Sequence, residues 1–289
     1  MSASDRGFAL LMVTIALATL SLIFAAALAT SREHLSATSD GLARTRLQAA
    51  IDGAVTTVKY ELAAARIAEP AVLSAPQTYD IGGVSVLVSA RPESAKIDLN
   101  AAGPSLIFRY LLHSGLSKSL ADAIIDEIIE HRKESDPVYA RRHDKAPARP
   151  FESVFELLAF KAMTADAMEC VQPDLTVFTG LADVDPVWAS QRVREADGLP
   201  AEAMHGAAGA HSAIAGSAVP GGAIFEVTAR ARDDATGQRQ SRQAVLRVTG
   251  NRRTPVWTLS VQSPAPNAKE AEAACRRMQD PIRTASEGR

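Results

Sequence analysis

The stretch FALLMVTIALATLSLIFAAALATS, residues 8–31, decides the fold, because it carries no charged residue over a length that could cross a bilayer. About 20 apolar residues in a helix span the hydrocarbon core, at about 1.5 Å per residue. The preceding residues, MSASDRG, are polar and end in Arg6 and Gly7. No Ala-x-Ala boundary leads from the apolar run into a change of structure. We therefore expect a retained membrane helix over 8–30 rather than a cleaved secretory signal.

The helical pattern continues beyond the apolar run. Apolar side chains recur at helical intervals, with arginines and lysines between them. These apolar residues are Leu35, Leu42, Leu47, Ile51, Val55, Val58 and Leu62. The pattern predicts that residues 31–68 extend the same helix and lay an apolar stripe on a folded domain. A single helix over 8–67 would be about 90 Å long.

The composition excludes several classes of protein. The chain has 289 residues, with 31 Lys and Arg against 33 Asp and Glu, and 5% of its residues are aromatic. A net charge of -2 argues against an extended nucleic-acid surface. The few aromatic residues argue against stacking platforms for bases or sugars. Cys170 and Cys275 allow one disulfide bond at most, and the sequence leaves open whether they pair.

Strand patterns occur in two separate parts of the chain, 77–101 and 181–262. The expected strands are 83–88, 95–100, 223–231, 241–248 and 255–261. We expect the two parts to form one α/β domain with an antiparallel sheet. Residues 206–222, rich in Ala, Gly and Ser, are expected to form a flexible loop, and residues 263–289 a flexible tail.

Residues 102–180 have a helical periodicity and separate these two parts. Two helices are expected on either side of Ser114-Gly115, a third from Phe151 and a fourth capped by Thr164. The predicted fold class is α+β. It combines a long N-terminal helix, packed on an antiparallel sheet, with an inserted all-helical domain similar to SAM and helix-hairpin-helix modules.

The N-terminus resembles the prepilin family, in which a short polar leader ending in Gly precedes Phe and a long apolar helix. The resemblance implies that residues 1–7 are a leader and that a prepilin peptidase cuts between Gly7 and Phe8. Phe8 would then become the N-methylated first residue. Most members carry Glu at the fifth mature position, which here is Met12. Lack of this acid is typical of the K-type minor pseudopilin of type II secretion, the tip subunit.

The middle of the chain resembles the same subunit independently. Residues 97–102 read Ile-Asp-Leu-Asn-Ala-Ala, a Pro-Phe-Glu-Ser-Val segment begins at Pro150, and residues 172–177 read Gln-Pro-Asp-Leu-Thr-Val. This order resembles the helical insertion of the K-type pseudopilin. The resemblance implies a non-enzymatic subunit that initiates and caps the pseudopilus for export of folded proteins across the outer membrane.

That assignment also implies a location and a set of partners. We expect a single-pass protein of the bacterial inner membrane with its C-terminal domain in the periplasm. Expected partners are the I-type and J-type minor pseudopilins, the major pseudopilin, the inner-membrane assembly platform and the prepilin peptidase, with no nucleic acid. Two alternatives stay open: a membrane-anchored DNA-uptake receptor with a helix-hairpin-helix module, and a minor pilin of a type IV pilus.

Catalytic and metal-binding patterns are weak. The sequence has no HExxH pair, Gly-x-Ser-x-Gly motif or phosphate-binding loop, so we expect no enzymatic activity and no cofactor. Asp122, Asp126 and Glu130 share one face of an expected helix and form a candidate calcium site. The alternative is a solvated helix face neutralised by the basic run His131-Arg132-Lys133.

Overall fold

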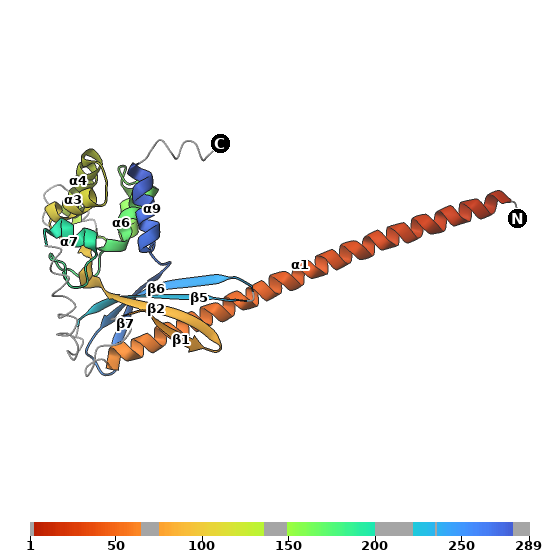
Figure 1. Ribbon diagram of the computed structural model, residues 1–289, viewed down its shortest axis with the longest axis horizontal. Helices are drawn as coiled ribbons and strands as arrows, with labels where there is room; N and C mark the ends of the chain where they lie inside the picture. Colours follow the sequence, from red (N-terminus) through yellow and green to blue (C-terminus); the bar gives the residue numbers. More distant parts are fainter. Residues whose placement is uncertain (1–2, 65–74, 136–148, 200–221, 235, 280–289) are drawn as a thin grey trace.

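The computed structural model describes residues 3–64, 75–135, 149–199, 222–234 and 236–279. Helix α1, Ala3–Ala64, is continuous and projects far beyond the rest of the molecule (Figure 1). The expected helix over 8–67 is therefore confirmed as far as Ala64. Residues 206–221 of the loop expected over 206–222, and the end of the chain from 280, lie outside the described residues.

The second half of α1 packs on the sheet through the predicted apolar stripe. Leu47, Ile51, Val55, Val58 and Leu62 are all buried against the strands. Leu42, expected in the same stripe, is 71% exposed, because at about 100° per residue it lies about 140° around the helix from Leu47. The helix also lies close to strand β1 (Gln77–Ile81): a Cβ added at Gly53 would come within 2.9 Å of Ile81.

The sheet has five antiparallel strands in the order β1-β2-β5-β6-β7. The strands are β1 (Gln77–Ile81), β2 (Val84–Pro92), β5 (Ile224–Arg232), β6 (Arg239–Val248) and β7 (Val256–Gln262). The three C-terminal strands are confirmed. Sequence analysis missed β1, whose hairpin with β2 turns at Gly82 and Gly83, both with positive φ. Such a two-residue turn suits glycine and matches the twist of the strands.

The alternation of side chains divides the sheet into two faces. Val86, Val88, Val227 and Ala229 point toward α1 and are fully buried. The opposite face, called the outer face below, carries the intervening residues, such as Leu87, Thr228 and Arg230. The period of two along each strand produces this division.

A helical domain lies between β2 and β5 in sequence. It contains η1 (Glu93–Ala95), β3 (Ile97–Asp98), α3 (Pro104–His113), α4 (Lys118–Ser135), η2 (Val154–Ala159), α6 (Ala165–Val171), η3 (Gln172–Asp174), β4 (Leu175–Thr176) and α7 (Gln191–Asp197). This domain sits at the end of the sheet farthest from the N-terminus of α1 (Figure 1). The inserted domain is therefore mainly helical, with α6 capped by Thr164 as expected. It is not all-helical, because β3 and β4 pair within it as a two-stranded parallel sheet.

Several expected boundaries were wrong. The strand expected over 95–100 is a 3-10 turn followed by the two-residue β3, because the Asp98 side chain accepts from the backbone N–H groups of Asn100 and Ala101 and bends the chain. The helix expected from Phe151 is the six-residue 3-10 helix η2, capped by Ser153. Residues 184–196, assigned to the sheet domain, contribute to the core of the helical domain instead.

The tail expected to be flexible over 263–289 is ordered in its first half. Ala268–Gln279 form helix α9, which packs on α6. Cys275 in α9 is joined to Cys170 in α6 by a disulfide bond. Ala271 and Ala274 are fully buried, so α9 belongs to the folded part of the molecule. The amphipathic spacing of these residues over a polar stretch is the signal that could have revealed the helix.

Candidate interaction surfaces

The described large apolar side chains in the N-terminal half of α1 form an exposed surface. The described apolar side chains there are Met12, Ile15, Leu17, Leu20, Leu22, Ile23 and Phe24, each 51–74% exposed. Leu22, Ile23 and Phe24 are consecutive, so they point to different sides of the helix, since each residue turns the helix by about 100°. A helix that is apolar all round is stable only when something apolar surrounds it.

The residues predicted for processing lie at the start of this surface. Gly7 and Phe8 belong to α1, and the side chain of Phe8 is not among those that the structure describes. Met12 is 54% exposed. Among the described residues there is no helix that combines the length and the apolar character needed to span a bilayer. The membrane span expected over 8–30 stays a prediction.

A buried carboxylate fixes the helical domain to the sheet. The Asp174 side chain is 2% exposed and accepts hydrogen bonds from Arg91 of β2 at 3.2 Å and from Ser190 at 2.8 Å. Arg192 forms an ion pair with the same carboxylate at 3.5 Å. Burial, and then the charge of Asp174, raise the pKa of the neighbouring Tyr110 hydroxyl well above its usual value. Asp174 therefore links β2, α3 and the start of α7.

A second buried cluster lies at the same junction. Lys96 forms ion pairs with Glu93, at 2.9 Å, and with Glu226 of β5. Gln243 of β6 donates to Glu226 at 2.6 Å. Burial alone would lower the pKa of Lys96, but the two carboxylates outweigh burial and raise it. Two strands of the sheet are thereby tied to the start of the helical domain.

The Ile-Asp-Leu-Asn motif singled out in the sequence has a structural role. One Asp98 oxygen accepts from the backbone of Thr179 and Gly180, and Asn100 exchanges two hydrogen bonds with the backbone of Phe151. Arg132 donates to the carbonyl oxygens of Leu99 and Ala102. The motif and Arg132 thus hold three distant segments of the helical domain together.

The turn between α3 and α4 has little capacity to bind phosphate. The N–H groups of Ser114, Gly115 and Leu116 all donate to carbonyl oxygens at the end of α3. A helix-hairpin-helix module needs such groups free to contact DNA. Arg132 is engaged within the protein, as described above, which leaves Lys118 as the exposed cation of this turn. The geometry therefore disfavours the DNA-receptor alternative.

The candidate calcium residues remain on the surface of α4. Asp122, Asp126 and Glu130 are exposed, and Glu130 pairs with Lys133 at 3.8 Å. In the described part of the chain, no three His, Cys, Asp or Glu side chains are grouped so that they could hold a metal ion. The three carboxylates therefore lie on a solvated face of α4. Of the basic run expected to neutralise them, Lys133 pairs with Glu130, whereas Arg132 points into the domain and His131 stacks on Phe151.

The chain is similar in structure to a known protein. No family model and no curated protein matches the chain. One solved structure to which it is similar is a chain of the GspK-GspI-GspJ complex of the type 2 secretion system from enterotoxigenic Escherichia coli. The TM-score is 0.49 at 13% sequence identity, and the match covers 75% of this chain and 94% of the other.

Proposed function

We propose that this protein is a K-type minor pseudopilin of a type II secretion system. In this role it stands at the tip of the pseudopilus, where it initiates and caps assembly for export of folded proteins. The observation that carries the proposal is the division of α1. One continuous helix exposes an apolar first half and packs its second half on an antiparallel sheet. This arrangement suits a subunit that is anchored in a membrane by the apolar half of its helix and then packs into a filament through the same helix.

The position of Met12 supports a place at the tip. An acid in the hydrocarbon region is costly unless it has a partner. In the pilin family the fifth-position acid pairs with the terminal amine of the next subunit up. A subunit with nothing above it needs no acid there, and Met12 is apolar. The terminal amino group of Phe8 would still form an ion pair with the fifth-position carboxylate of a subunit joining below.

The helical domain supports capping. It lies at the end of the sheet farthest from the apolar half of α1 (Figure 1). A further subunit stacking above would meet this domain first. The Asp174 and Lys96 clusters join it to the sheet through buried ion pairs. The proposed role is mechanical and involves no catalysis.

The disulfide bond supports a location outside the cytoplasm. Disulfides between buried cysteines persist in oxidising compartments and are rare in the bacterial cytoplasm. Cys170 and Cys275 are 0% and 8% exposed and are bonded to each other. We therefore place the folded domain in the periplasm, with α1 anchored in the inner membrane. I-type and J-type minor pseudopilins are the proposed partners beside α1.

Processing by a prepilin peptidase tests the proposal. The full chain coexpressed with the peptidase should yield a protein that begins at N-methylated Phe8, seen by intact mass spectrometry. Gly7→Val should block cleavage, because the valine side chain would not fit the narrow protease site. Ser4→Val, farther from the cut, should leave cleavage unchanged. Retention of Met1 in the unchanged chain, or cleavage near Ala29, would remove the basis of the pseudopilin assignment.

A further inference from the structure

The outer face of the sheet is half covered. Toward the helical domain its residues are buried: Thr228, Gln243 and Val245 are 9%, 3% and 1% exposed. Toward the β1–β2 and β5–β6 turns, the face is open. There the outer-face residues are all exposed: Thr78, Ser85, Leu87, Arg230, Arg232, Arg239 and Ser241. We call these seven residues the arginine groove.

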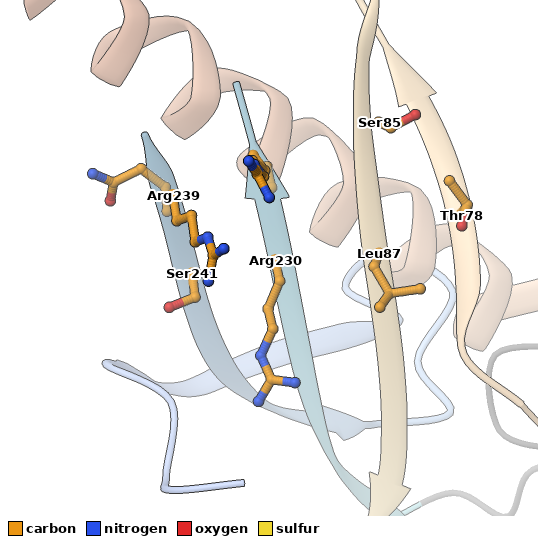
Figure 2. Close-up of a pocket in the computed structure, with 9 residues that line it drawn as sticks. Thr78, Ser85, Leu87, Arg230, Arg239 and Ser241 are labelled. Atoms are coloured by element: carbon orange, nitrogen blue, oxygen red, sulfur yellow. The ribbon is translucent and has the colours of Figure 1, made fainter. Parts of the chain in front are cut away.

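The arginine groove is a shallow depression of about 490 Å³ that crosses strands β1, β2, β5 and β6. Figure 2 shows Leu87, Arg230 and Ser241 side by side on three neighbouring strands. Leu87 is 46% exposed and offers an apolar contact beside the guanidinium groups. The residues that line the groove include three arginines and no acid.

The charges of the groove are poorly balanced within the chain. Arg232 lies directly opposite Arg239 on the neighbouring strand, a like-charge pairing that destabilises a sheet. Among the described residues neither Arg230 nor Arg239 has an ion pair, and Arg232 reaches only the 98% exposed carboxylate of Asp234, at 3.7 Å. The other acid on this part of the outer face, Asp80, accepts from the backbone N–H of Gly83.

We propose that the arginine groove docks a carboxylate-bearing segment of a neighbouring protein subunit. The proposal rests on the proposed function, which places other subunits alongside α1. The residues that line the groove include no negative charge to balance its arginines. Carboxylates of a partner would supply that charge and accept paired hydrogen bonds from arginine. The exposed Leu87 favours a polypeptide over a free anion, because a peptide also brings apolar side chains to the centre of the groove.

The groove lies on the face of the sheet that α1 does not cover. It is at the end of the sheet beside the β1–β2 turn, where Arg46 of α1 donates to the carbonyl of Gly82, and this end is the nearer one to the apolar half of α1. A subunit whose helix runs parallel to α1 would occupy this side. Anionic lipid headgroups would also pair with the arginines, through phosphate oxygens instead of carboxylates. The photocrosslinking experiment separates them from a protein partner.

Site-specific photocrosslinking in living cells tests the proposal. A photoreactive p-benzoylphenylalanine replaces Ser241 in the otherwise unchanged full chain, expressed together with the other subunits of its secretion system. We expect a protein adduct that maps to an acidic segment of a minor pseudopilin. Arg230→Glu with Arg239→Glu should reduce the adduct at least about tenfold, because like charges across an interface repel. The matched control is Arg252→Glu with Arg253→Glu, exposed arginines of the β6–β7 turn, which should leave the adduct unchanged.

A charge exchange completes the test. Changing the carboxylates of the crosslinked segment to arginine should restore the adduct with the double glutamate variant. A lipid adduct, a protein adduct that ignores the charge reversal, or no adduct in cells that still assemble the pseudopilus would overturn the docking site alone. A charge-dependent adduct with an acidic protein that is not a pseudopilin would support the groove and contradict the proposed function.

Discussion

Arg91 of strand β2 and Asp174 of the helical domain contact each other directly, with both terminal nitrogens of Arg91 at 3.2 Å from one carboxylate oxygen. The residues are separated by 83 positions in the sequence, and the contact joins the sheet to the inserted domain. Arg91 also donates to the backbone carbonyl of Ala95, which anchors the turn that leaves the sheet. The relative placement of the two domains depends on this contact and on the Lys96 cluster.

Removal of the Asp174 carboxylate should destabilise the protein strongly. Asp174→Ala leaves Arg91, Arg192 and Ser190 without their shared acceptor, and breaking a buried ion pair costs about 3–5 kcal/mol. Chemical denaturation, monitored by circular dichroism, measures the loss. Arg91→Ala should cost less, because the Arg91 side chain is 28% exposed and Arg192 still pairs with the carboxylate. Equal losses for the two variants would argue against Asp174 as the centre of the network.

Lys96 should be more costly to remove alone than together with its partners. Lys96→Met leaves the buried Glu93 and the partly buried Glu226 without their cation, at a cost of about 3–5 kcal/mol. The triple variant Lys96→Met, Glu93→Gln, Glu226→Gln removes the unpaired charges, so we expect its unfolding free energy to lie closer to that of the unchanged protein. Denaturant titration of both variants decides the point. A triple variant less stable than Lys96→Met would contradict this account.

The disulfide should hold α9 on the helical domain. The double variant Cys170→Ala, Cys275→Ala opens a link between residues 105 positions apart, and loss of a native disulfide costs about 2–5 kcal/mol. Hydrogen exchange should show faster exchange in α9 than in α3. Arg277→Ala, which removes the exposed ion pairs between α9 and Asp166 and Glu169, is the control and should have a smaller effect. Unchanged exchange in α9 without the disulfide would show that packing alone holds the helix.

Periodic patterns predicted the parts of the fold that depend on local chain geometry. The stripe from Leu47 to Leu62 predicted which side of α1 is buried, because one residue in every three or four returns to the same face. The alternation in β5 and β6 predicted both strands within two residues of their ends. Ser114 and Gly115 predicted the break between α3 and α4, where Gly115 has a positive φ.

Contacts between distant segments could not be predicted in the same way. Asp98 was part of a family motif in the sequence, but its partners Thr179 and Gly180 lie more than 80 residues away. The pairing of Cys170 with Cys275 depends on α9, whose polar sequence suggested a loose tail. The arginine groove is assembled from strands separated by the whole helical domain. Its residues share no sequence pattern, since only the strand register brings them together.

The free energy of unfolding at alkaline pH should depend on the hydrogen bond of Tyr79. Its hydroxyl donates to Glu61 of α1 at 3.0 Å, and burial, this hydrogen bond and the nearby charge raise the pKa of Tyr79 to about 12. Because the folded state holds this proton more tightly than the unfolded chain, its contribution is complete below about pH 10 and is lost as the pH rises toward 12. Tyr79→Phe should therefore be less stable by about 1 kcal/mol at pH 8, and the difference should shrink by pH 11.5.

Thermal unfolding of the two proteins between pH 8 and 11.5 measures this trend. Tyr60→Phe, which removes an exposed hydroxyl from the same helix, is the matched control. We expect its stability at pH 8 to stay within about 0.5 kcal/mol of the unchanged protein. A difference between Tyr79→Phe and the unchanged protein that grows with pH would reverse the sign of the argument and exclude Glu61 as its cause.

Met12→Glu tests the position of the subunit in the filament. The variant would place a carboxyl in the hydrocarbon region without a subunit above to pair with it, at a cost of about 2–3 kcal/mol on insertion scales. We expect it to insert or assemble less well, while Met12→Leu behaves as the unchanged protein. The variant should still be unable to occupy internal positions, because the helical domain would collide with a subunit above.

Crosslinking along α1 in assembled filaments measures the position of the subunit directly. We expect I-type and J-type partners beside the helix and none above it. Repeated copies of this protein along the filament shaft would contradict the tip model, whether or not the glutamate is tolerated.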